Sequence, residues 1–382
     1  MSSLPPGADQ SLARIVGHGV TDWSVTPLSG SIGNQAGEVL RVCARRSGDA
    51  WSVVLKILRP AAAGSAFPAI GTIPKGWGRS AEHSHYWQRE ALFYDSALPA
   101  QLETPAARTP RPLFVEDHGD QMWIWLEDIA DDIPGPWPTD RLIRAAQQVA
   151  GLTAASAPAV LAPDPALLRH ALRAWVDDLQ AANITAAGDR RTWSHPYVDI
   201  TLPDGNLARM RRLFEDRDVL LDALTAAPQV VVHLDAHRRN VLTAIAPRGE
   251  SSVLIDWAYA GTGGVGEDLG SLVGMTFMLG EVAPCDPRDV SNAAFDAYIE
   301  GLRSAGWNGD ERRVRFAGHA ACALQAGMLS SNLASLSGID PDADPALDEV
   351  IRDSTELLAT TNDHFLWHAD EAWHLLEVAE RH

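Results

Sequence analysis

The stretch from Gln229 to Leu269, QVVVHLDAHRRNVLTAIAPRGESSVLIDWAYAGTGGVGEDL, decides the fold. It contains two short apolar runs, VVV and VLI, and each leads directly into a loop that carries a carboxylate. The first loop reads His233-x-Asp235-x-x-x-x-Asn240, and the second begins with Asp256. A strand that ends in a polar loop presents side chains at a rigid edge, where active sites are commonly built. The pattern therefore predicts a site that contains two carboxylates and an amide.

The spacing within the first loop favours phosphoryl transfer. Asp235 and Asn240 can share one tight loop, with the Asp facing an incoming hydroxyl and the Asn facing a metal ion held by phosphates. Such a reaction is accelerated mainly by positioning and charge neutralisation. An alcohol is a far weaker acid than an Asp side chain, whose reference pKa is about 3.9. Asp235 is therefore expected to orient the hydroxyl and to accept its proton only as the bond to phosphorus forms.

The second carboxylate needs a partner, because Asp256 directly follows an apolar run and an unpaired buried charge is costly. Mg²⁺ prefers carboxylate, amide, phosphate and water oxygens. Asp256 and Asn240 are therefore predicted to bind Mg²⁺. The alternative is a carboxylate that only caps a turn beside Trp257.

Composition excludes several classes of protein. The chain has 382 residues, of which 46% are hydrophobic and 21% are charged, enough for two domains or lobes with a substantial core. Lys plus Arg number 31 and Asp plus Glu 50, so the net charge is 31 − 50 = −19. Nucleic acid is an improbable partner, because phosphate binding needs a basic surface. The acidity is compatible with a cationic substrate, and equally with an acidic surface that only keeps the protein soluble.

Cysteine usage and hydropathy predict a soluble, cytoplasmic protein. Cys43, Cys285 and Cys322 are odd in number and far apart, which makes a disulfide framework improbable. The N-terminal segment has no apolar region typical of a secretory signal. No apolar run approaches the roughly 18 to 20 residues that span a bilayer, so no membrane association is expected.

The N-terminal third has the pattern of an antiparallel β unit. Alternation through Val39, Arg41 and Cys43 and the β-branched run WSVVLKIL at 51–58 predict strands. The Ala-, Gly- and Pro-rich residues Arg59 to Ser80 are predicted to form a long, ordered or semi-ordered loop. The remaining predicted elements are a helix from Ser84 to Leu98 and two strands, Arg111 to Glu116 and Met122 to Leu126.

Helical periodicity dominates the rest of the chain. The expected helices cover Arg141 to Ala155, Pro165 to Asn183, Leu207 to Leu224, Asp286 to Ala305, Asp310 to Leu333 and Pro345 to the C-terminus. The predicted fold is therefore α+β, with a small antiparallel β N-lobe that carries one helix and a larger, mainly helical C-lobe. The boundary is placed after Glu127, which gives residues 1–127 and 128–382.

One lysine in the predicted sheet requires a partner. Alternation in WSVVLKIL places Lys56 on the inward face of its strand with Val54 and Leu58. Glu90 on the following helix is the preferred partner, although Glu82 and Asp95 are also near. A lysine at a strand edge that extends its ammonium to water is the alternative.

These residues resemble a known family. Lys56, Glu90, HLDAHRRN and IDW followed by GVGEDL look like the aminoglycoside phosphotransferase and choline kinase branch of the protein-kinase-like fold. The resemblance covers roughly Ser24 to Leu279, and the two central loops are its most specific part. It implies a kinase that transfers the γ-phosphoryl group of ATP or GTP to a hydroxyl of a small molecule, with Mg²⁺.

The resemblance also implies roles for individual residues. The nucleotide would contact Lys56 at the α/β-phosphates with Glu90 as its partner, Ser31 and Gly33 in a loop over the phosphates, and the hinge backbone from Glu127 to Ile129. The chemistry would use Asp235 as catalytic base, Asn240 and Asp256 as Mg²⁺ ligands, and His233 and Asp268 as supports.

Several features fit the family less closely. The loop SGSIGNQ, Ser29 to Gln35, is not G-x-G-x-x-G, and a plain hairpin turn explains it equally well. Arg238 and Arg239 in the catalytic loop could contact phosphate or an anionic substrate, or pair with carboxylates. No Walker motif is present, which makes a P-loop kinase improbable. His364, His368 and His374 have a spacing that could hold a metal, but a helix surface carrying histidines is preferred.

Two other functions remain possible at this stage. A nucleotide-binding regulatory protein without turnover would share the fold, and a hydrolase with paired aspartates would leave Lys56 and Glu90 unexplained. The acceptor is open among aminoglycosides and other antibiotics, amino sugars and choline-like amines, and net acidity favours a cation.

Overall fold

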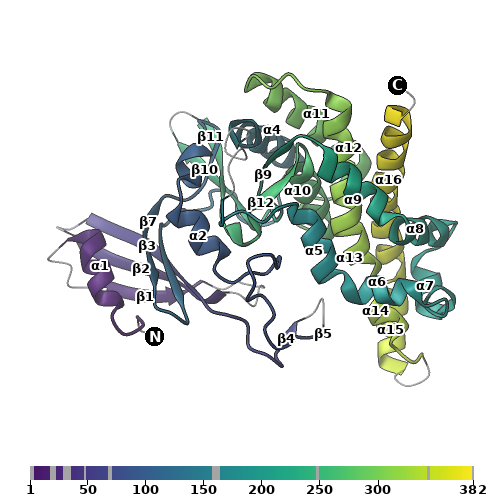
Figure 1. Cartoon of the computed structure of the whole chain (residues 1–382), viewed down its shortest axis with the longest axis horizontal. Helices are drawn as coiled ribbons and strands as arrows, with labels where there is room; N and C mark the ends of the chain where they lie inside the picture. The colour runs from purple at the N-terminus through teal and green to yellow at the C-terminus, as the bar shows by residue number, and fades with distance from the viewer. Residues whose placement is uncertain are drawn as a thin grey trace.

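The computed structural model describes residues 4–17, 23–28, 36–46, 49–67, 71–156, 164–246, 249–341 and 345–380. A five-stranded sheet lies at one end of the molecule and a large group of helices, which includes the C-terminal helix, at the other (Figure 1). This arrangement confirms the predicted α+β fold with two lobes. The phosphate-loop candidates Ser31 and Gly33 lie outside the described residues.

The N-lobe sheet contains β1 (Trp23–Pro27), β2 (Ala36–Arg46), β3 (Asp49–Leu58), β7 (Pro112–Asp117) and β8 (Met122–Glu127), in the order β1-β2-β3-β8-β7. Every neighbouring pair is antiparallel, as the alternation predicts. Helix α1 (Ala8–Val16) buries Leu12 and Val16 in one cluster with Val53, Leu55 and Ile57 of β3. Since Lys56 and Leu58 on the opposite face are also buried, β3 is the central, doubly covered strand.

The segment between β3 and the next helix differs from its prediction. The helix expected from Ser84 to Leu98 is replaced by α2 (Arg89–Asp95) and α3 (Leu98–Gln101). Turns occupy residues 74–88, and a short hairpin, β4 (Ala66–Phe67) and β5 (Gly71–Thr72), precedes them. Gly78 has φ +69°, and a Cβ there would lie 2.4 Å from the His85 carbonyl oxygen. This tight turn brings the chain back on itself and postpones the helix to Arg89.

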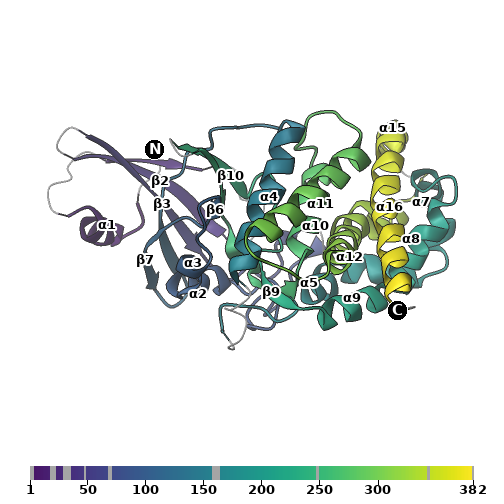
Figure 2. The ribbon, with the colours of Figure 1, turned by 90° about the horizontal axis from the view of Figure 1, so that it is seen from above.

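The C-lobe is mainly helical. Its first half contains α4 (Thr139–Ser156), α5 (Ala171–Leu179), α6 (Ala181–Gly188), η2 (Thr192–Ser194), α7 (Pro196–Thr201), α8 (Asn206–Glu215) and α9 (Arg217–Ala226). Its second half contains α10 (Glu267–Met278), α11 (Pro287–Ser304), α12 (Glu311–Cys322), the π-turn η4 (Ala323–Gly327), α13 (Met328–Ser331), α14 (Leu333–Ser337), α15 (Pro345–Asp353) and α16 (Thr355–Glu380). Helices α4 and α11 lie side by side in both views (Figures 1 and 2).

Four long predicted helices are interrupted. The one expected from Pro345 to the C-terminus breaks at Ser354, between α15 and α16. The one expected from Pro165 begins only at Ala171 and breaks at Gln180, whose ψ is 3°. The one expected from Leu207 breaks at Asp216. The one expected from Asp310 passes through the π-turn and ends at Asn332, which has φ 49°. Side-chain periodicity continues across such joints, so it does not reveal them.

A small β region lies among the helices. Strand β9 (Gln229–Val232) pairs antiparallel with β12 (Gly261–Gly264), and β10 (Val241–Ala246) pairs antiparallel with β11 (Gly249–Leu254). Strand β6 (Ala107–Arg108) joins β11 in parallel. The two apolar runs of the central stretch are strands, as predicted, but they belong to two different sheets.

The boundary after Glu127 stays a prediction, and two segments cross it. Strand β6 precedes it in sequence yet pairs with β11. Phe67 and Trp77 also precede it, yet they belong to the same core cluster as Leu172 and Val176 of α5. The cysteines are free, as expected. Within the described part of the chain, no helix is long and apolar enough to cross a membrane.

Candidate active site

Lys56 lies between two carboxylates. Its Nζ is 2.5 Å from Glu90 Oε2 and 2.8 Å from Asp256 Oδ1. Burial alone would lower the pKa of Lys56, but the charges of Asp256 and Glu90 outweigh burial and raise that pKa. The lysine is therefore a fixed cation on the central strand of the sheet. The partner predicted from strand alternation, Glu90, is the one that the fold provides; Glu82 is exposed and pairs with Ser80.

The catalytic-loop candidates contact one another directly. Asn240 Nδ2 donates to Asp235 Oδ2 at 2.8 Å and to the Asp235 carbonyl oxygen at 3.0 Å. These bonds fix the amide nitrogen on the Asp235 side and leave Oδ1 as the end of Asn240 that is free to bind a cation. His237 Nε2 is 3.5 Å from Asp235 Oδ1. The Asp235 side chain is 22% exposed, so it is held in position and still open to a ligand.

Buried bonds brace this loop from below. Asp268 accepts the backbone N–H of His233 at 2.9 Å and that of Leu234 at 2.9 Å. His233 receives the Asp235 N–H at Nδ1 and contacts the Ile255 carbonyl oxygen through Nε2 at 2.8 Å, so the proton belongs on Nε2. Burial lowers the pKa of His233, which keeps the ring neutral in that tautomer. Both residues expected to support the loop therefore contact its backbone.

Leu234 is the strained point of the loop. Its φ is 64°, a left-handed value that is unusual for a branched residue. Its carbonyl oxygen accepts Ser271 Oγ at 2.8 Å and Gln325 Nε2 at 2.7 Å. The two bonds, from α10 and from the π-turn, hold the conformation that turns Asp235 out of the strand.

The Asp256 loop is fixed by aromatic packing. Asp256 also has a left-handed backbone, with φ 63°. The ring of the next residue, Trp257, stacks on Phe93 of α2 at 4.3 Å between centroids and 6° between planes, and its Nε1 donates to the Leu254 carbonyl oxygen. Burial acts to raise the pKa of Asp256, but Lys56 holds it below its ordinary value. The packing places an ionised carboxylate beside both Lys56 and Asn240.

These side chains meet at a cavity of about 460 Å³ between the lobes. Its walls are apolar and come from both lobes: Leu28, Val39, Val54, Leu126, Leu242 and Ile255. Its polar lining includes Lys56, Glu90, Asn240 and Asp256, and Glu127, Asp128 and Ile129 line it where the chain passes from β8 into the C-lobe. The remaining charged lining residues are Arg41, Asp131, Arg238 and Arg239. A cavity with both apolar and charged lining suits a nucleotide, whose base is planar and whose phosphates are anionic. Asp235 is not among the lining residues, but its carboxylate contacts Asn240, which lines the cavity.

The predicted hinge residues are tied to the sheet through side chains. The Glu127 carboxylate pairs with Arg108 and accepts the Arg111 N–H at 2.6 Å. Asp128 forms two contacts with Arg41 of β2, at 2.7 and 2.9 Å. The side chains of Glu127 and Asp128 are thus both ion-paired with arginines.

The two loop arginines pair with carboxylates. Buried Arg238 lies 2.8 Å from Asp131 Oδ2, donates to the carbonyl oxygens of Ile133 and Gly135, and lies over the Trp137 ring. Arg239 is 2.6 Å from Glu281 Oε1. Of the alternatives open at the sequence level, the structure shows carboxylate pairing for both, although both also line the cavity.

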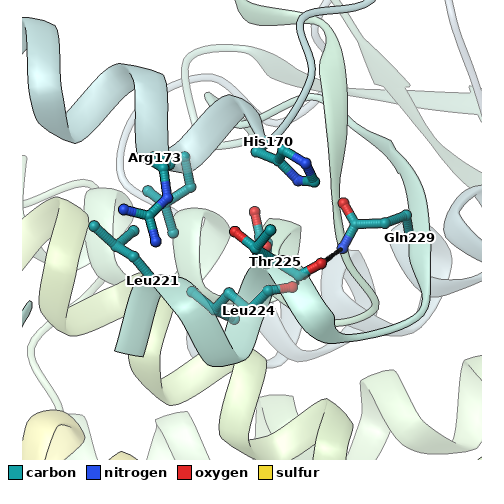
Figure 3. Close-up of a pocket in the computed structure, with 8 residues that line it drawn as sticks. His170, Arg173, Leu221, Leu224, Thr225 and Gln229 are labelled. Atoms are coloured by element: carbon teal, nitrogen blue, oxygen red, sulfur yellow. Dashed lines mark hydrogen bonds between the residues drawn. The ribbon is translucent and has the colours of Figure 1, made fainter. Parts of the chain in front are cut away.

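A second cavity, of about 10 Å³, lies beside the start of β9 (Figure 3). Gln229 crosses one side of it and donates to the carbonyl oxygens of Leu224 and Ala227. Glu267 also lines it and accepts the Gly264 N–H at 2.6 Å. Burial raises the pKa of Glu267 to about 8. The volume suits one water molecule, and the cavity supports the β9–β12 pair rather than forming part of the cleft.

The expectation of a histidine-bearing helix surface is wrong for two of three residues. His364 and His368 are buried, with 4% and 0% exposure, and only His374 is exposed. His368 Nδ1 is 2.8 Å from Nδ1 of His319 on α12, a contact between distant helices that spacing cannot reveal. Among the described residues no group of three or more His, Cys, Asp or Glu could hold a metal ion.

Comparison with known proteins gives the family. The model of the phosphotransferase enzyme family matches residues 35–317. The chain belongs to this family. A search of curated proteins finds no match.

Solved structures share the fold of this phosphotransferase. An amicoumacin kinase is 14% identical with a TM-score of 0.52, covering 90% of this chain and 87% of that one. A microcompartment-associated aminopropanol kinase is 14% identical with a TM-score of 0.53, covering 96% and 98%. An aminoglycoside phosphotransferase from Alicyclobacillus acidocaldarius is 15% identical with a TM-score of 0.50, covering 99% and 98%. At these identities the likeness establishes the fold alone, and it confirms the predicted protein-kinase-like architecture.

Sequence reasoning missed several residues that shape the site of this phosphotransferase. Gln325 and Ser271 contact the Leu234 carbonyl oxygen from distant helices. Phe93 stacks on Trp257, and Tyr259 contacts His85. The sequence gives little indication of these contacts, since each residue lies within a common apolar or helical pattern. Most tryptophans of the chain are buried.

Proposed function

We propose that this phosphotransferase is a small-molecule kinase that transfers the γ-phosphoryl group of ATP or GTP to a hydroxyl of its acceptor. The observation that carries the proposal is the meeting of Lys56, Glu90, Asp256 and Asn240 at a cavity of about 460 Å³, with Asp235 bonded to Asn240 beside it. The solved amicoumacin kinase of the same fold contains AMP-PNP and Ca²⁺, which supports a nucleotide and a divalent cation here.

The cavity residues suggest how the nucleotide is held. The apolar walls from Val39, Val54, Leu242 and Ile255 would enclose the base, and the backbone at Glu127 to Ile129 would contact its edge. Lys56, which Glu90 keeps in place, would bind the α/β-phosphates. The phosphate-loop residues Ser31 and Gly33 remain a proposal from the sequence.

The donor set fits a hard divalent cation. Asp256 and Asn240 line the same cavity, one with a carboxylate and the other with an amide whose nitrogen is already bonded to Asp235. Carboxylate and amide oxygens are ligands of Mg²⁺, which when bound neutralises the phosphate charge that develops during transfer. Asp256 and Asn240 are the residues that would hold it.

Asp235 would act on the acceptor. The hydroxyl oxygen forms a bond to the γ-phosphorus while the bond from phosphorus to the β–γ bridging oxygen breaks and the nucleoside diphosphate leaves. The hydroxyl proton moves to the Asp235 carboxylate as the new bond forms. His233 and Asp268 keep Asp235 in place through the loop backbone.

The test is Asp235→Asn, which keeps the size of the side chain and removes its charge. Turnover is expected to fall at least about 1,000-fold, since the general base and the orientation of the hydroxyl are both lost. The affinity for Mg²⁺·AMP-PNP, measured by calorimetry, should change less than about threefold. Unchanged turnover in this variant would refute the assignment. Nucleotide binding without any Asp235-dependent consumption of ATP or GTP would instead favour a regulatory protein.

A further inference from the structure

One stretch of the C-lobe is basic in an otherwise acidic chain. Residues 190–217 carry six arginines and four carboxylates, whereas the whole chain has a net charge of −19. Three of these arginines form ion pairs: Arg191 with Asp189, Arg209 with Asp363 and Asp370, and Arg212 with Asp216 and Glu377. The other three, Arg190, Arg211 and Arg217, line a single cavity.

This cavity, of about 220 Å³, lies between α6, η2, α8 and the first residue of α9. Two buried rings line it, those of Trp193 and Phe214, which meet edge to face at 6.3 Å between centroids. Ile184 and Ala187 of α6 complete the apolar lining. The Trp193 Nε1–H donates to the Ala187 carbonyl oxygen at 2.8 Å, so the indole donor is satisfied. Because a cavity of about 150 Å³ can admit benzene, this one has room for a substituted aromatic ring.

Arg217 keeps hydrogen-bond donors that no described residue engages. Its Nη1 donates to the Phe214 carbonyl oxygen at 2.7 Å, but its Nε is buried without a hydrogen-bond partner among the described residues. Asp218 lies 3.6 Å from Nη2, which is too long for a hydrogen bond. The Arg217 side chain is 23% exposed, so a ligand can reach it. Since a guanidinium has five N–H donors, an acceptor from outside the chain would stabilise Arg217.

The other two arginines leave the cavity with an excess of positive charge. Arg211 Nε donates to Glu215 Oε1 at 2.7 Å, and both residues line the cavity, so their charges cancel. Arg190 is exposed, and no carboxylate in the described part of the chain pairs with it. The lining thus contains three arginines and one glutamate. Because a guanidinium stays protonated in proteins, the cavity favours an anion.

The cavity lies apart from the nucleotide cleft. None of its lining residues also lines the cavity of about 460 Å³ between the lobes. Helix α8, which carries Arg211 and Phe214, lies beyond α5 as seen from the sheet in both views (Figures 1 and 2). A ligand bound here would therefore not compete with a nucleotide.

We propose that this cavity is a second ligand site and that it binds a small aromatic carboxylate. The ring would pack against Trp193 and Phe214, while the carboxylate pairs with Arg217 and Arg190. Guanidinium groups bind carboxylates in a planar, bidentate geometry, and the Glu215 charge disfavours a dianion such as inorganic phosphate. The residues concerned lie outside the cleft, so the inference is independent of the proposed kinase function.

The test measures binding to the full-length protein by isothermal titration calorimetry. Benzoate and phenylacetate are the probes, acetate lacks the ring, benzyl alcohol lacks the charge, benzylamine reverses it, and inorganic phosphate supplies an anion without a ring. Both aromatic carboxylates are expected to bind with a Kd of about 1 mM or lower, and the other compounds at least about tenfold more weakly. The Kd should change less than about twofold when Mg²⁺·AMP-PNP is added, because the two cavities share no lining residue.

Arg217→Gln removes a charge from the cavity and keeps a donor for the Phe214 carbonyl oxygen. It is expected to raise the Kd of both aromatic carboxylates roughly 10- to 100-fold, the effect of losing one hydrogen bond to a charged group. Arg212→Gln is the matched control, because Arg212 lies over the Trp373 ring at 4.6 Å and does not line the cavity. This variant loses the same charge from α8 and should leave the Kd within about twofold. An equal rise in both variants would indicate a general electrostatic effect and would overturn the assignment.

Ala187→Leu tests the apolar part of the site without changing its charge. The larger side chain fills space beside Trp193 and should raise the Kd of both probes at least about tenfold, with the unfolding temperature followed by circular dichroism as the check on folding. The inference fails if neither aromatic carboxylate binds with a Kd below about 10 mM, if phosphate binds as tightly, or if Mg²⁺·AMP-PNP displaces the probes. None of these results bears on the dependence of nucleotide consumption on Asp235, which tests the proposed kinase function.

Discussion

Lys56 is the counter-charge of two carboxylates in the cleft. It lies within 2.8 Å of two carboxylates, and burial raises the pKa of one of them, Glu90, to about 7 against the opposing charge of Lys56. Without the lysine, a buried Glu90 would have no counter-charge. Breaking a buried pair from one side costs about 3–5 kcal/mol, whereas replacing both partners by neutral groups is often tolerated.

Lys56→Met should therefore lower the thermal unfolding temperature more than Lys56→Met/Glu90→Gln. With a shift of roughly 2–4 °C per kcal/mol, the difference is expected to exceed about 4 °C at pH 8, where Glu90 is ionised in the folded protein. Thermal unfolding followed by circular dichroism measures it. Equal unfolding temperatures for the two variants would show that Glu90 does not depend on the lysine for its stability.

For single residues, the sequence was informative where the local pattern of a strand or loop determines which way a side chain points. Alternation predicted that Lys56 points inward and needs Glu90, and the structure shows the contact. The loop pattern predicted Asp235 and Asn240 together. Partners such as Tyr259 and His85, which are 174 residues apart, leave no local pattern, because only tertiary folding brings them together.

Among the elements, the π-turn η4 supports the loop that bears Asp235. A π-turn widens the helix by one residue per turn and is often found near functional sites. Here it carries Gln325, whose side chain donates to the carbonyl oxygen of strained Leu234. The irregular turn, which periodicity could not predict, thus connects a helix of the C-lobe to the loop that bears Asp235.

Gln325→Ala should reduce kcat about tenfold and leave the nucleotide KM unchanged, since losing one buried hydrogen bond of about 1 kcal/mol lets the loop relax away from its left-handed conformation. Steady-state kinetics distinguishes the two constants. Ser331→Ala, which removes a buried hydroxyl bonded to the Met328 carbonyl oxygen on the same helical run, should lower stability with no change in kcat. A kcat decrease of the same size in both variants would contradict a specific role for the turn.

For the whole molecule, buried histidines with lowered pKa values destabilise the fold in acid, and three of them, His319, His364 and His368, lie together between α12 and α16. Burial lowers the pKa of His319 to about 3 and that of His364 to about 4, and it lowers the pKa of His368 well below the ordinary value of 6.5. All three are therefore neutral in the folded protein. Because the unfolded chain binds more protons than the folded one below pH 6.5, stability is unaffected above that pH and falls as the pH decreases toward 4.

Each such histidine should cost about 2 kcal/mol of folding free energy at pH 5. Replacing both members of the closest pair, His319→Leu/His368→Leu, is expected to flatten the decline in unfolding free energy between pH 7 and pH 5. Urea titrations at several pH values provide the measurement. The exposed His374→Leu serves as control and should leave the slope unchanged. A double variant with the wild-type slope would show that other groups govern acid unfolding.

The sequence predicted the overall fold better than it predicted the segments that connect the strands and helices. The change from period-2 to helical patterns predicted a β-rich part followed by helices, and the two central loops placed the site between them. Strand β6 is too short to produce a pattern, and the turns at residues 74–88 resemble a helix start until Gly78 is seen to lie against His85. Features made by close approach of distant segments are therefore the ones that the sequence did not predict.

The pairing of β6 with β11 has a mechanical consequence. Through this pairing, Ala107 and Arg108 are held against the C-lobe. The chain that leads from β6 into β7 can therefore bend only after Arg108. The outgoing chain crosses at Glu127 to Ile129, and the Glu127 N–H donates to the Arg111 carbonyl oxygen at 3.1 Å. Two neighbouring connections between the lobes, one after Arg108 and one at Glu127 to Ile129, restrict the lobes to rotation about a single axis. We therefore expect the lobes to open and close about one axis, along the edge of the cavity farthest from the phosphate end.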